Sequence, residues 1–368
     1  MLFGVLSPVA VCAWSALIGD ATTAAQLQGA LATGSNWTFV VRDDSSSGAR
    51  MPPGIDVVVG SGSHPMLSVL VPPLPAGRPP PRLYQYLYTG VDRLLPQIPA
   101  ALTVCNVHQA ADAIAEYVMA GVLGWCVRLA AADAAMRACA WNGTSSAGCG
   151  AMPTHRQAKG QTIGVLGYGH IGEGIATRAA AFGMRVIGTT LDPPAAPPPP
   201  LAWLGSDANN SRLVRESDFL VVAVPDVPAT LSLVGAPLLE QMRATAVLIN
   251  VASARVVDEA ALHGALATGA LGGAIVDTWW NRAWQDPGAS GAASEPSAFR
   301  FDLLPNVVMD ATLSTHTAES AATALAEAAA NLDAFARGQP LANIVRNGTQ
   351  SSTTLGDAAL DSVAQSLL

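Results

Sequence analysis

The sequence predicts an α/β protein built on mostly parallel sheets, and three observations support that fold class. Short apolar runs bounded by turn residues alternate with segments of helical periodicity along most of the chain. The runs at residues 219–224 and 246–251 are continuously apolar, as expected for strands buried on both faces of a parallel sheet. A glycine-rich turn at residues 167–172 lies between a strand-like run and a helix-like segment, which is typical of a βαβ unit.

Composition limits the classes of protein to which this chain can belong. Its 368 residues are many for one domain and suit two, and half of them are hydrophobic, enough for a large core. The net charge of −8 and the lack of a Lys/Arg-rich run argue against nucleic-acid binding. The five cysteines have neither CxxC nor Cys/His spacing, so we expect reduced thiols and no metal site.

The first residues admit two interpretations. Residues 2–6 are predicted to form a first β-strand, because no basic segment precedes them and Ser7 and Pro8 interrupt the apolar run. A secretory signal peptide is the alternative, and the four Asn-x-Ser/Thr sequons do not decide the question, since such short patterns arise by chance. No uninterrupted apolar run reaches transmembrane length, so we expect a cytoplasmic protein without membrane contact.

Further elements of the N-terminal third follow from apolar runs that end at turn residues. Strands are predicted at residues 37–41, 55–59, 83–92, where the strand runs into a turn, and 102–107. Proline-rich residues 72–81 form a connection. Apolar side chains at helical spacing predict a long helix at residues 112–128, which would bridge two domains.

The rest of the chain alternates strands with helices around the glycine-rich turn. Residues 141–160 are predicted to form a surface loop, and six prolines exclude regular structure at residues 193–200. Residues 281–300 form another predicted loop, and the tail after Arg346 is polar. Strands are predicted at residues 162–166, 184–187, 219–224, 246–251, 273–276 and 307–309, and helices at residues 175–182, 258–267 and 318–335.

The glycines of the turn at residues 167–172 have separate physical roles in a GxGxxG pattern. Gly167 allows a tight turn, Gly169 lets the backbone approach a pyrophosphate, and Gly172 lets the helix pack closely on the strand. The helix then presents free N–H groups and a partial positive charge to the phosphates. The spacing therefore predicts a Rossmann-type dinucleotide site.

Five segments carry a resemblance to a known family: IAEYV at residues 114–118, GVLGYGHIG at 164–172, SDFLVVAVP at 217–225, LINVA at 248–252 with VDEAAL at 257–262, and LPNVV at 304–308. On these motifs the chain resembles the D-isomer-specific 2-hydroxyacid dehydrogenases from about Leu83 to Val345. The resemblance implies a Rossmann-type doubly wound domain, residues 131–317, inserted into a smaller flavodoxin-like α/β catalytic domain. The catalytic domain would combine residues 1–130 with residues 318–368.

The resemblance also implies three catalytic side chains, none of which this chain has at the expected position. Members of the family use an arginine to bind the substrate carboxylate, a histidine as general acid/base, and a glutamate to orient that histidine. Counting from Asp258, Asp277 and Pro305, the corresponding positions hold Ser253, Arg282 and Thr312.

Two neighbouring residues are candidates to replace the missing groups. Arg255 lies two residues past Ser253, and His316 four residues past Thr312. A surface arginine and a polar residue at a helix start are the simpler interpretations of these two. His108 and His170 are weaker candidates, and His170 is already explained by its place in the dinucleotide loop.

The resemblance gives the following residues to the cofactor site: Gly167, Tyr168, Gly169, His170, Ile171, Gly172, Thr190, Val224, Pro225, Val251, Ala252 and Asp277. An acidic residue that ends the second strand of such a unit binds the ribose hydroxyl of NAD. Thr190 occupies that position, with Asp192 two residues beyond and no arginine to bind a 2′-phosphate. We therefore favour NAD over NADP, without excluding NADP.

Two functions stay open. One is an NAD(P)-dependent oxidoreductase acting on a small 2-hydroxy or 2-keto acid, with activity weak or lost. The other is a catalytically inactive NAD(H)-binding sensor or interaction protein, since a fold alone does not fix function. In either case we expect a homodimer, because relatives pair through this region and the helix at residues 112–128 has a wide apolar face.

Overall fold

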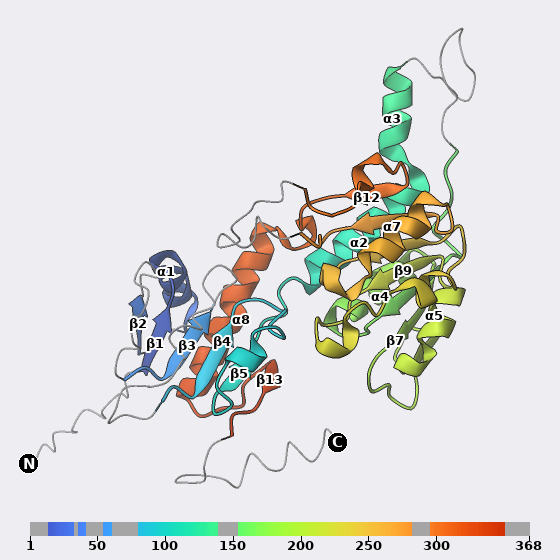
Figure 1. Ribbon diagram of the computed structural model, residues 1–368. Coiled ribbons are helices and arrows are strands. Elements are labelled where there is room, and N and C mark those ends of the chain that lie inside the picture. The colour runs from blue at the N-terminus through green and yellow to red at the C-terminus, as the bar shows by residue number, and fades with distance from the viewer. Residues whose placement is uncertain are drawn as a thin grey trace, which may run out of the picture. The chain divides into compact units, whose positions relative to one another are not determined.

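The computed structural model describes residues 14–32, 36–41, 54–60, 80–138, 154–281 and 295–349. The chain divides into two compact units. Unit 1 consists of Met1–Tyr88, Leu94–Val107 and Leu325–Leu368, and unit 2 consists of Thr89–Arg93 and His108–Ala324. Figure 1 labels elements of both units where there is room.

Unit 2 contains a seven-stranded sheet in which neighbouring strands are parallel, in the order β12-β11-β10-β9-β6-β7-β8. The strands are β6 (Thr162–Leu166), β7 (Arg185–Thr189), β8 (Trp203–Gly205), β9 (Phe219–Val222), β10 (Val247–Asn250), β11 (Gly273–Val276) and β12 (Val307–Met309). Strand β6 pairs with β7 on one side and with β9 on the other, so the chain order reverses there. In doubly wound sheets, ligands bind at the carboxyl ends of the strands beside such a reversal.

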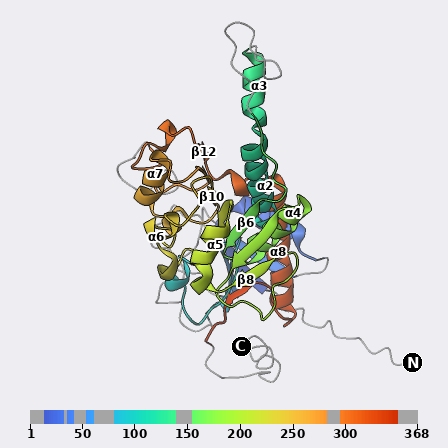
Figure 2. The ribbon, with the colours of Figure 1, turned by 90° about the vertical axis from the view of Figure 1, so that its right-hand side faces the viewer.

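Helices cover both faces of this sheet (Figure 2). Helices α2 (Ala111–Val127) and α4 (His170–Ala181) contribute to one cluster of buried side chains. Helices α5 (Asn210–Glu216), α6 (Ala236–Leu239) and α7 (Glu259–Ala267) contribute to a second cluster. Strands β6, β9, β10 and β11 are buried along their whole length, which explains why their sequences are apolar at nearly every position.

Unit 1 contains a six-stranded sheet in the order β13-β5-β4-β3-β1-β2. Its strands are β1 (Trp14–Ile18), β2 (Trp37–Val41), β3 (Val57–Gly60), β4 (Leu83–Tyr86), β5 (Thr103–Cys105) and β13 (Ile344–Arg346). Its helices are α1 (Ala21–Ala30) and the part of α8 (Ala318–Ala336) from Leu325 on. The first five strands are parallel in a flavodoxin-like order, and only β13 is antiparallel to its neighbour. Together the two sheets confirm the predicted fold class.

Three elements of unit 1 were missed or placed elsewhere by the sequence patterns. The first described strand is β1, whereas the strand predicted at residues 2–6 lies outside the described residues. Helix α1 follows at once, begun by Asp20, whose carboxylate accepts the Thr23 N–H at 2.7 Å. Its small and polar residues give no apolar periodicity. Strand β13 is largely exposed and directly precedes the tail that was predicted to be polar.

The helix predicted to bridge two domains belongs to unit 2. The buried face of α2, with Ile114, Val118 and Val122, joins the same cluster as α4. Unit 2 therefore resumes at His108, well before the predicted boundary at residue 131, and it ends at Ala324.

Helix α3 (Leu129–Arg137) follows α2 after a break with a 48° bend, and it has no buried residue. Within the described ranges, no single helix is long and apolar enough to cross a membrane. Only the bent pair α2 and α3 reaches that length and composition.

Candidate functional site at the carboxyl edge of the seven-stranded sheet

The turn between β6 and α4 has the backbone geometry of a phosphate-binding glycine loop. Gly167 has a φ of +98°, and a Cβ there would lie 2.8 Å from the backbone of Ala223, so only glycine fits. A Cβ at Gly172 would lie 3.1 Å from the carbonyl oxygen of Gly167. The absence of a Cβ at this position therefore allows α4 to pack closely on β6. At Gly169 a Cβ would meet no atom within 4 Å. Packing inside the protein therefore does not require this glycine, and the space beside its backbone is open to a ligand.

Hydrogen bonds fix this turn against β7. The backbone N–H groups of Gly167 and Tyr168 both donate to the carbonyl oxygen of Thr189, at 3.0 and 2.8 Å. Gly169 is the N-cap of α4, so the N–H groups of residues 170–172 precede the hydrogen-bonded ladder of the helix. These groups and the helix dipole fit an anionic pyrophosphate, which is the chemistry of a dinucleotide cofactor.

The other predicted cofactor residues follow the carboxyl ends of neighbouring strands. They are Thr190 after β7, Val224 and Pro225 after β9, Val251 and Ala252 after β10, and Asp277 after β11. Since the strands are parallel, all these residues lie along the edge at which the glycine turn leaves β6. Thr190 is half-buried and donates its N–H to the carbonyl oxygen of Gly205 at 2.9 Å, whereas Asp192 is exposed.

Asp277 is buried and holds the segment after β12 in place. Its carboxylate oxygens accept the N–H and the hydroxyl of Ser314 at 2.9 and 2.7 Å, and its carbonyl oxygen accepts the N–H of Thr312 at 2.8 Å. Burial, together with the neighbouring Asp310 carboxyl, raises the pKa of Asp277 to about 6, although the bonds from Ser314 oppose this rise. The hydroxyl of Tyr117 in turn donates to Asp310. Asp277 therefore has a clear structural part at this edge.

The three positions at which the predicted catalytic side chains were missing differ in how well they are described. Ser253 is half-buried and directly precedes the short 3-10 helix η5 (Ala254–Val256). Thr312 has a φ of +61°, a left-handed conformation that is uncommon for threonine, before the 3-10 helix η7 (Leu313–Thr315). Arg282 lies outside the described residues. Neither Ser253 nor Thr312 has a side chain that titrates near neutral pH.

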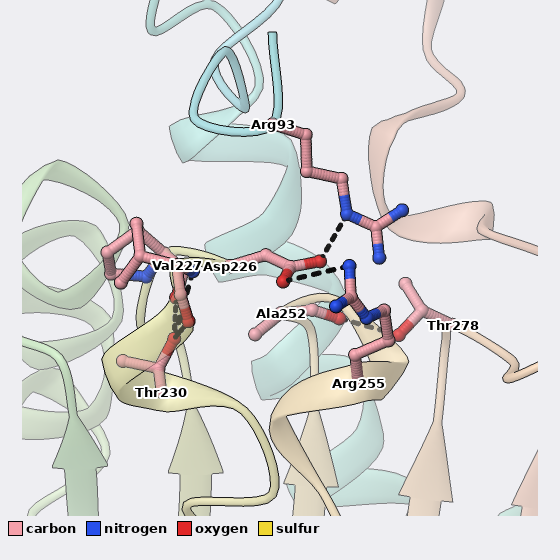
Figure 3. Close-up of polar contacts among 8 residues, drawn as sticks. Arg93, Asp226, Val227, Thr230, Ala252, Arg255 and Thr278 are labelled. Carbon is pink, nitrogen blue, oxygen red and sulfur yellow. Dashed lines mark hydrogen bonds and ion pairs between the residues drawn. The ribbon is translucent and has the colours of Figure 1, made fainter. Parts of the chain in front are cut away.

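The two candidate replacements are both engaged with the protein itself. A ring nitrogen of His316, Nδ1, lies 2.5 Å from the carbonyl oxygen of Thr312, and the side chain is exposed. The guanidinium of Arg255 faces Asp226, with Nη1 3.7 Å from a carboxylate oxygen. Arg93 binds the other oxygen of Asp226 through Nε at 2.6 Å (Figure 3).

Two histidines stack beside the glycine turn. The rings of His108 and His170 lie with their centroids 4.0 Å apart and their planes 27° from parallel. Burial, and to a lesser extent repulsion from His170, lowers the pKa of His108 to about 4. At neutral pH His108 is therefore uncharged.

The sequence patterns missed several polar groups of this edge. Arg93, Asp226 and Asp310 belong to no recognised motif, and Arg93 is separated from Asp226 by 133 positions. Tyr117 lies in the IAEYV segment, but no role for its hydroxyl was predicted. Only the proximity of Asp226 to the end of a predicted strand could have indicated it. Among the described residues there is no group of three or more His, Cys, Asp or Glu side chains that could hold a metal ion.

Comparison with known proteins identifies the family to which the chain belongs. Residues 119–310, just over half of the chain, match the family model described as "D-isomer specific 2-hydroxyacid dehydrogenase, NAD binding domain". A glyoxylate reductase of Thermococcus litoralis is 30% identical over 247 residues, which are 66% of this chain and 69% of that protein. A glyoxylate reductase of Thermococcus gammatolerans is 34% identical over 170 residues. The match covers 46% of this chain and 50% of that relative, so the chain spans about half of the relative's length.

Solved structures of the same family have the same fold. A D-isomer specific 2-hydroxyacid dehydrogenase of Xanthobacter autotrophicus, in complex with NADPH and MES, has a TM-score of 0.67 at 23% identity, covering 91% of this chain and 99% of its own. The NADPH-dependent glyoxylate/hydroxypyruvate reductase of Sinorhizobium meliloti, with NADP and malonate, also has a TM-score of 0.67, at 20% identity, covering 94% and 100%. The chain carries the NAD-binding domain of this family, with the glycine turn that such a cofactor requires, and it belongs to the D-isomer specific 2-hydroxyacid dehydrogenases.

Proposed function

We propose that this protein binds NAD(P) at the glycine turn and that its turnover of 2-hydroxy or 2-keto acids is weak or lost. The observation that carries the proposal is the contrast between an intact turn at Gly167, Gly169 and Gly172 and the small hydroxyl side chains at Ser253 and Thr312. The turn acts through backbone N–H groups, whereas the chemical step depends on side chains.

The reaction needs a group that exchanges a proton with the substrate oxygen and a group that binds the substrate carboxylate, and neither Thr312 nor Ser253 supplies one. The cofactor, when bound, exchanges a hydride with the substrate carbon, and the substrate oxygen must gain or lose a proton at the same time. Thr312 cannot exchange a proton efficiently near pH 7, and Ser253 cannot bind a carboxylate through two parallel hydrogen bonds. A replacement by His316 would have to act through Nε2, because Nδ1 faces the carbonyl oxygen of Thr312.

NAD is the favoured cofactor. Thr190 leaves the position after β7 without an acidic side chain, and the exposed Asp192 is the nearest carboxylate along the chain that could bind a ribose hydroxyl. We expect tighter binding of NADH than of NADPH, measured by the fluorescence of the reduced cofactor. The variant D192A should weaken NADH binding and leave NADPH binding unchanged. Tighter binding of NADPH by the wild type would reverse this assignment.

The second candidate is a catalytically inactive NAD(H)-binding sensor or interaction protein. It makes the same use of the glycine turn and needs no acid/base group. A panel of 2-keto acids that includes glyoxylate and hydroxypyruvate, which the names of relatives suggest, separates the two functions. NADH oxidation with any of them supports a residual enzyme. NADH binding without oxidation of any supports the sensor, and absence of NADH binding contradicts both.

A homodimer is the proposed assembly, but with a different contact surface from the one expected. The apolar face of α2 is buried in the core of unit 2. On α3, in contrast, Leu129 is 72% and Met136 is 42% exposed to solvent. A second copy that packs on α3 would bury these side chains. Sedimentation velocity should give a dimer for the wild type and a monomer for the double variant L129E/M136E. The control F182E, at another exposed apolar residue of unit 2, should remain dimeric; a monomeric wild type would contradict the assembly.

A further inference from the structure

Two arginines and one carboxylate meet at the carboxyl edge of the seven-stranded sheet. Asp226 follows β9, and Arg255 belongs to η5, which follows β10. Arg93 comes from the separate segment Thr89–Arg93 of unit 2. Figure 3 shows both guanidinium groups directed at the carboxylate of Asp226. This is the edge at which a ligand of a doubly wound sheet binds.

The two arginines hold the carboxylate unequally. Arg93 Nε lies 2.6 Å from one oxygen of Asp226, within hydrogen-bond distance. Arg255 Nη1 lies 3.7 Å from the other oxygen, which is an ion pair beyond hydrogen-bond distance. Within the described part of the chain, the Arg255 side chain makes no hydrogen bond. Its five N–H donors therefore leave room for another acceptor.

Exposure and charge favour an external anion here. The side chain of Asp226 is only 10% exposed, whereas those of Arg93 and Arg255 are 37% and 49% exposed. The guanidinium groups are therefore more accessible to a ligand from solvent than the carboxylate is. Another acidic group among the described residues, Asp92, interacts with Asp226: burial raises the pKa of Asp92, a backbone hydrogen bond lowers it, and repulsion from Asp226 adds to the rise.

The loop that carries Asp226 is fixed in position. The hydroxyl of Thr230 donates to the carbonyl oxygens of Pro225 and Val227, at 2.5 and 3.0 Å, and it accepts the N–H of Val227 at 3.1 Å (Figure 3). These bonds close the turn on either side of Asp226. Its carboxylate is therefore held in place before any ligand arrives.

The loop that carries Arg255 is fixed in the same way. The hydroxyl of Thr278, after β11, donates a hydrogen bond to the carbonyl oxygen of Ala252 at 2.5 Å. The same hydroxyl accepts a hydrogen bond from the side-chain amide Nδ2 of Asn250 at 3.2 Å. The carbonyl oxygen of Arg255 accepts the N–H of Ser232 at 2.8 Å. These bonds fix the backbone from which the Arg255 side chain extends, so less backbone freedom is lost when the side chain binds an anion.

We propose that Arg93 and Arg255 form a subsite for the carboxylate of a small organic acid, and that Asp226 occupies this subsite as an internal competing carboxylate. The assignment of an organic acid rests on the proposed function. Guanidinium groups bind carboxylates through paired hydrogen bonds, and Arg255 has its donors available for such a pair. An entering carboxylate binds Arg255 and draws Arg93 away from Asp226, so the affinity of the wild type is low.

Titration calorimetry with oxamate, a carboxylate analogue of a 2-keto acid, tests this subsite with and without saturating NADH. The neutral oxamide is the ligand control. The isosteric variant D226N should bind oxamate about tenfold more tightly than the wild type, and R255A about tenfold more weakly. R255K, which keeps the charge but loses the paired geometry, should lie between R255A and the wild type.

The matched control is R243A. Arg243 forms an ion pair with Asp218 at 2.6 Å and is 50% exposed, but this pair lies at the amino end of β9. Its oxamate affinity should equal that of the wild type. Unchanged or weaker binding in D226N, or unchanged binding in R255A, overturns the subsite even when NADH binding is intact. A wild-type protein that does not bind NADH would instead contradict the proposed function.

Discussion

The β6–α4 turn and the loops that follow β10 and β12 belong to one edge of the same sheet, yet they differ in what the family's chemistry requires of them. The turn works through its backbone, and its restrictions are steric: Gly167 has a φ of +98° and no room for a Cβ. The loops work through side chains, and neither Ser253 nor Thr312, which has a left-handed backbone, supplies the chemistry.

The difference teaches that binding and turnover can be separated along one sheet edge. The pyrophosphate site at a helix N-terminus is made of backbone N–H groups, which most side-chain substitutions leave in place. A general acid/base disappears with a single residue. We therefore expect this protein to retain cofactor binding and to have low turnover, and substitutions on either side of this contrast test it.

The largest expected effect is the loss of cofactor binding in G169V. A valine fits the protein, because Gly169 has an extended backbone and no atom within 4 Å of a Cβ, but its side chain would occupy the space of a pyrophosphate. NADH affinity should fall by about 100-fold or more, while the melting temperature stays near that of the wild type. The control G264A, at another glycine with open space, should bind normally. Equal affinity in G169V and the wild type would remove the turn from the account.

G167A should show the opposite pattern from G169V. An alanine at a φ of +98° is strained, and its Cβ would lie 2.8 Å from the backbone of Ala223. We expect a loss of about 1–3 kcal/mol in the free energy of unfolding. Chemical denaturation measures this, and an unchanged midpoint would contradict the steric argument.

An effect of comparable size is a gain of turnover in the double variant S253R/T312H. Restoring a general acid/base is worth about 10²–10⁴-fold in rate where the rest of the site is competent. The control S253R/T312N keeps the arginine and supplies a residue that tolerates the left-handed backbone but does not exchange protons. NADH oxidation with glyoxylate should rise in the first variant and not in the second. Equal rates in both would show that position 312 does not face the substrate.

A smaller effect concerns the pH dependence of stability at Asp277. Because its pKa is raised from 3.8 to about 6 in the folded protein, the folded state retains a proton that the unfolded state releases. This group therefore adds stability at low pH that is lost as the pH rises through about 4 to 6. D277N should flatten this dependence and gain stability relative to the wild type as the pH rises. Thermal unfolding across this range measures it, and parallel curves for the two proteins would contradict the assigned pKa.

A pH effect of similar size and opposite sign concerns His108, beside the glycine turn. The pKa of His108 falls from 6.5 to about 4 on folding, so the unfolded chain binds a proton more readily between these values. Stability from this group is present above about pH 6.5 and is lost as the pH falls towards 4. H108N should lose less stability on acidification than the wild type. An unchanged acid limb of the unfolding curve would argue against a buried neutral histidine at this position.

Burial explains which parts of the fold are predictable from the sequence. Strands β6, β9, β10 and β11 are buried throughout, and such burial leaves an apolar run that no loop imitates. Edge strands β8 and β13 are only partly buried and are held by pairing, so their sequences carry no such run. The boundary of unit 2 depends on the contact between α2 and α4, which no local pattern records.

The candidate site divides along the same line. The glycine turn is predictable, because its backbone restrictions act on neighbouring residues and leave a fixed spacing. The Arg93–Asp226–Arg255 group is not, since it joins residues that are distant in the sequence and its members resemble ordinary surface charges. Only the folded chain brings them together.

The most direct test of the central claim combines both halves of the comparison in one sample. The wild type is first titrated with NADH until its fluorescence change is saturated, and glyoxylate is then added while NADH absorbance is followed. The account predicts saturable NADH binding and an oxidation rate at least about 100-fold below the ~10 s⁻¹ median of enzymes. Oxidation near that median, or no saturable NADH binding, would contradict it.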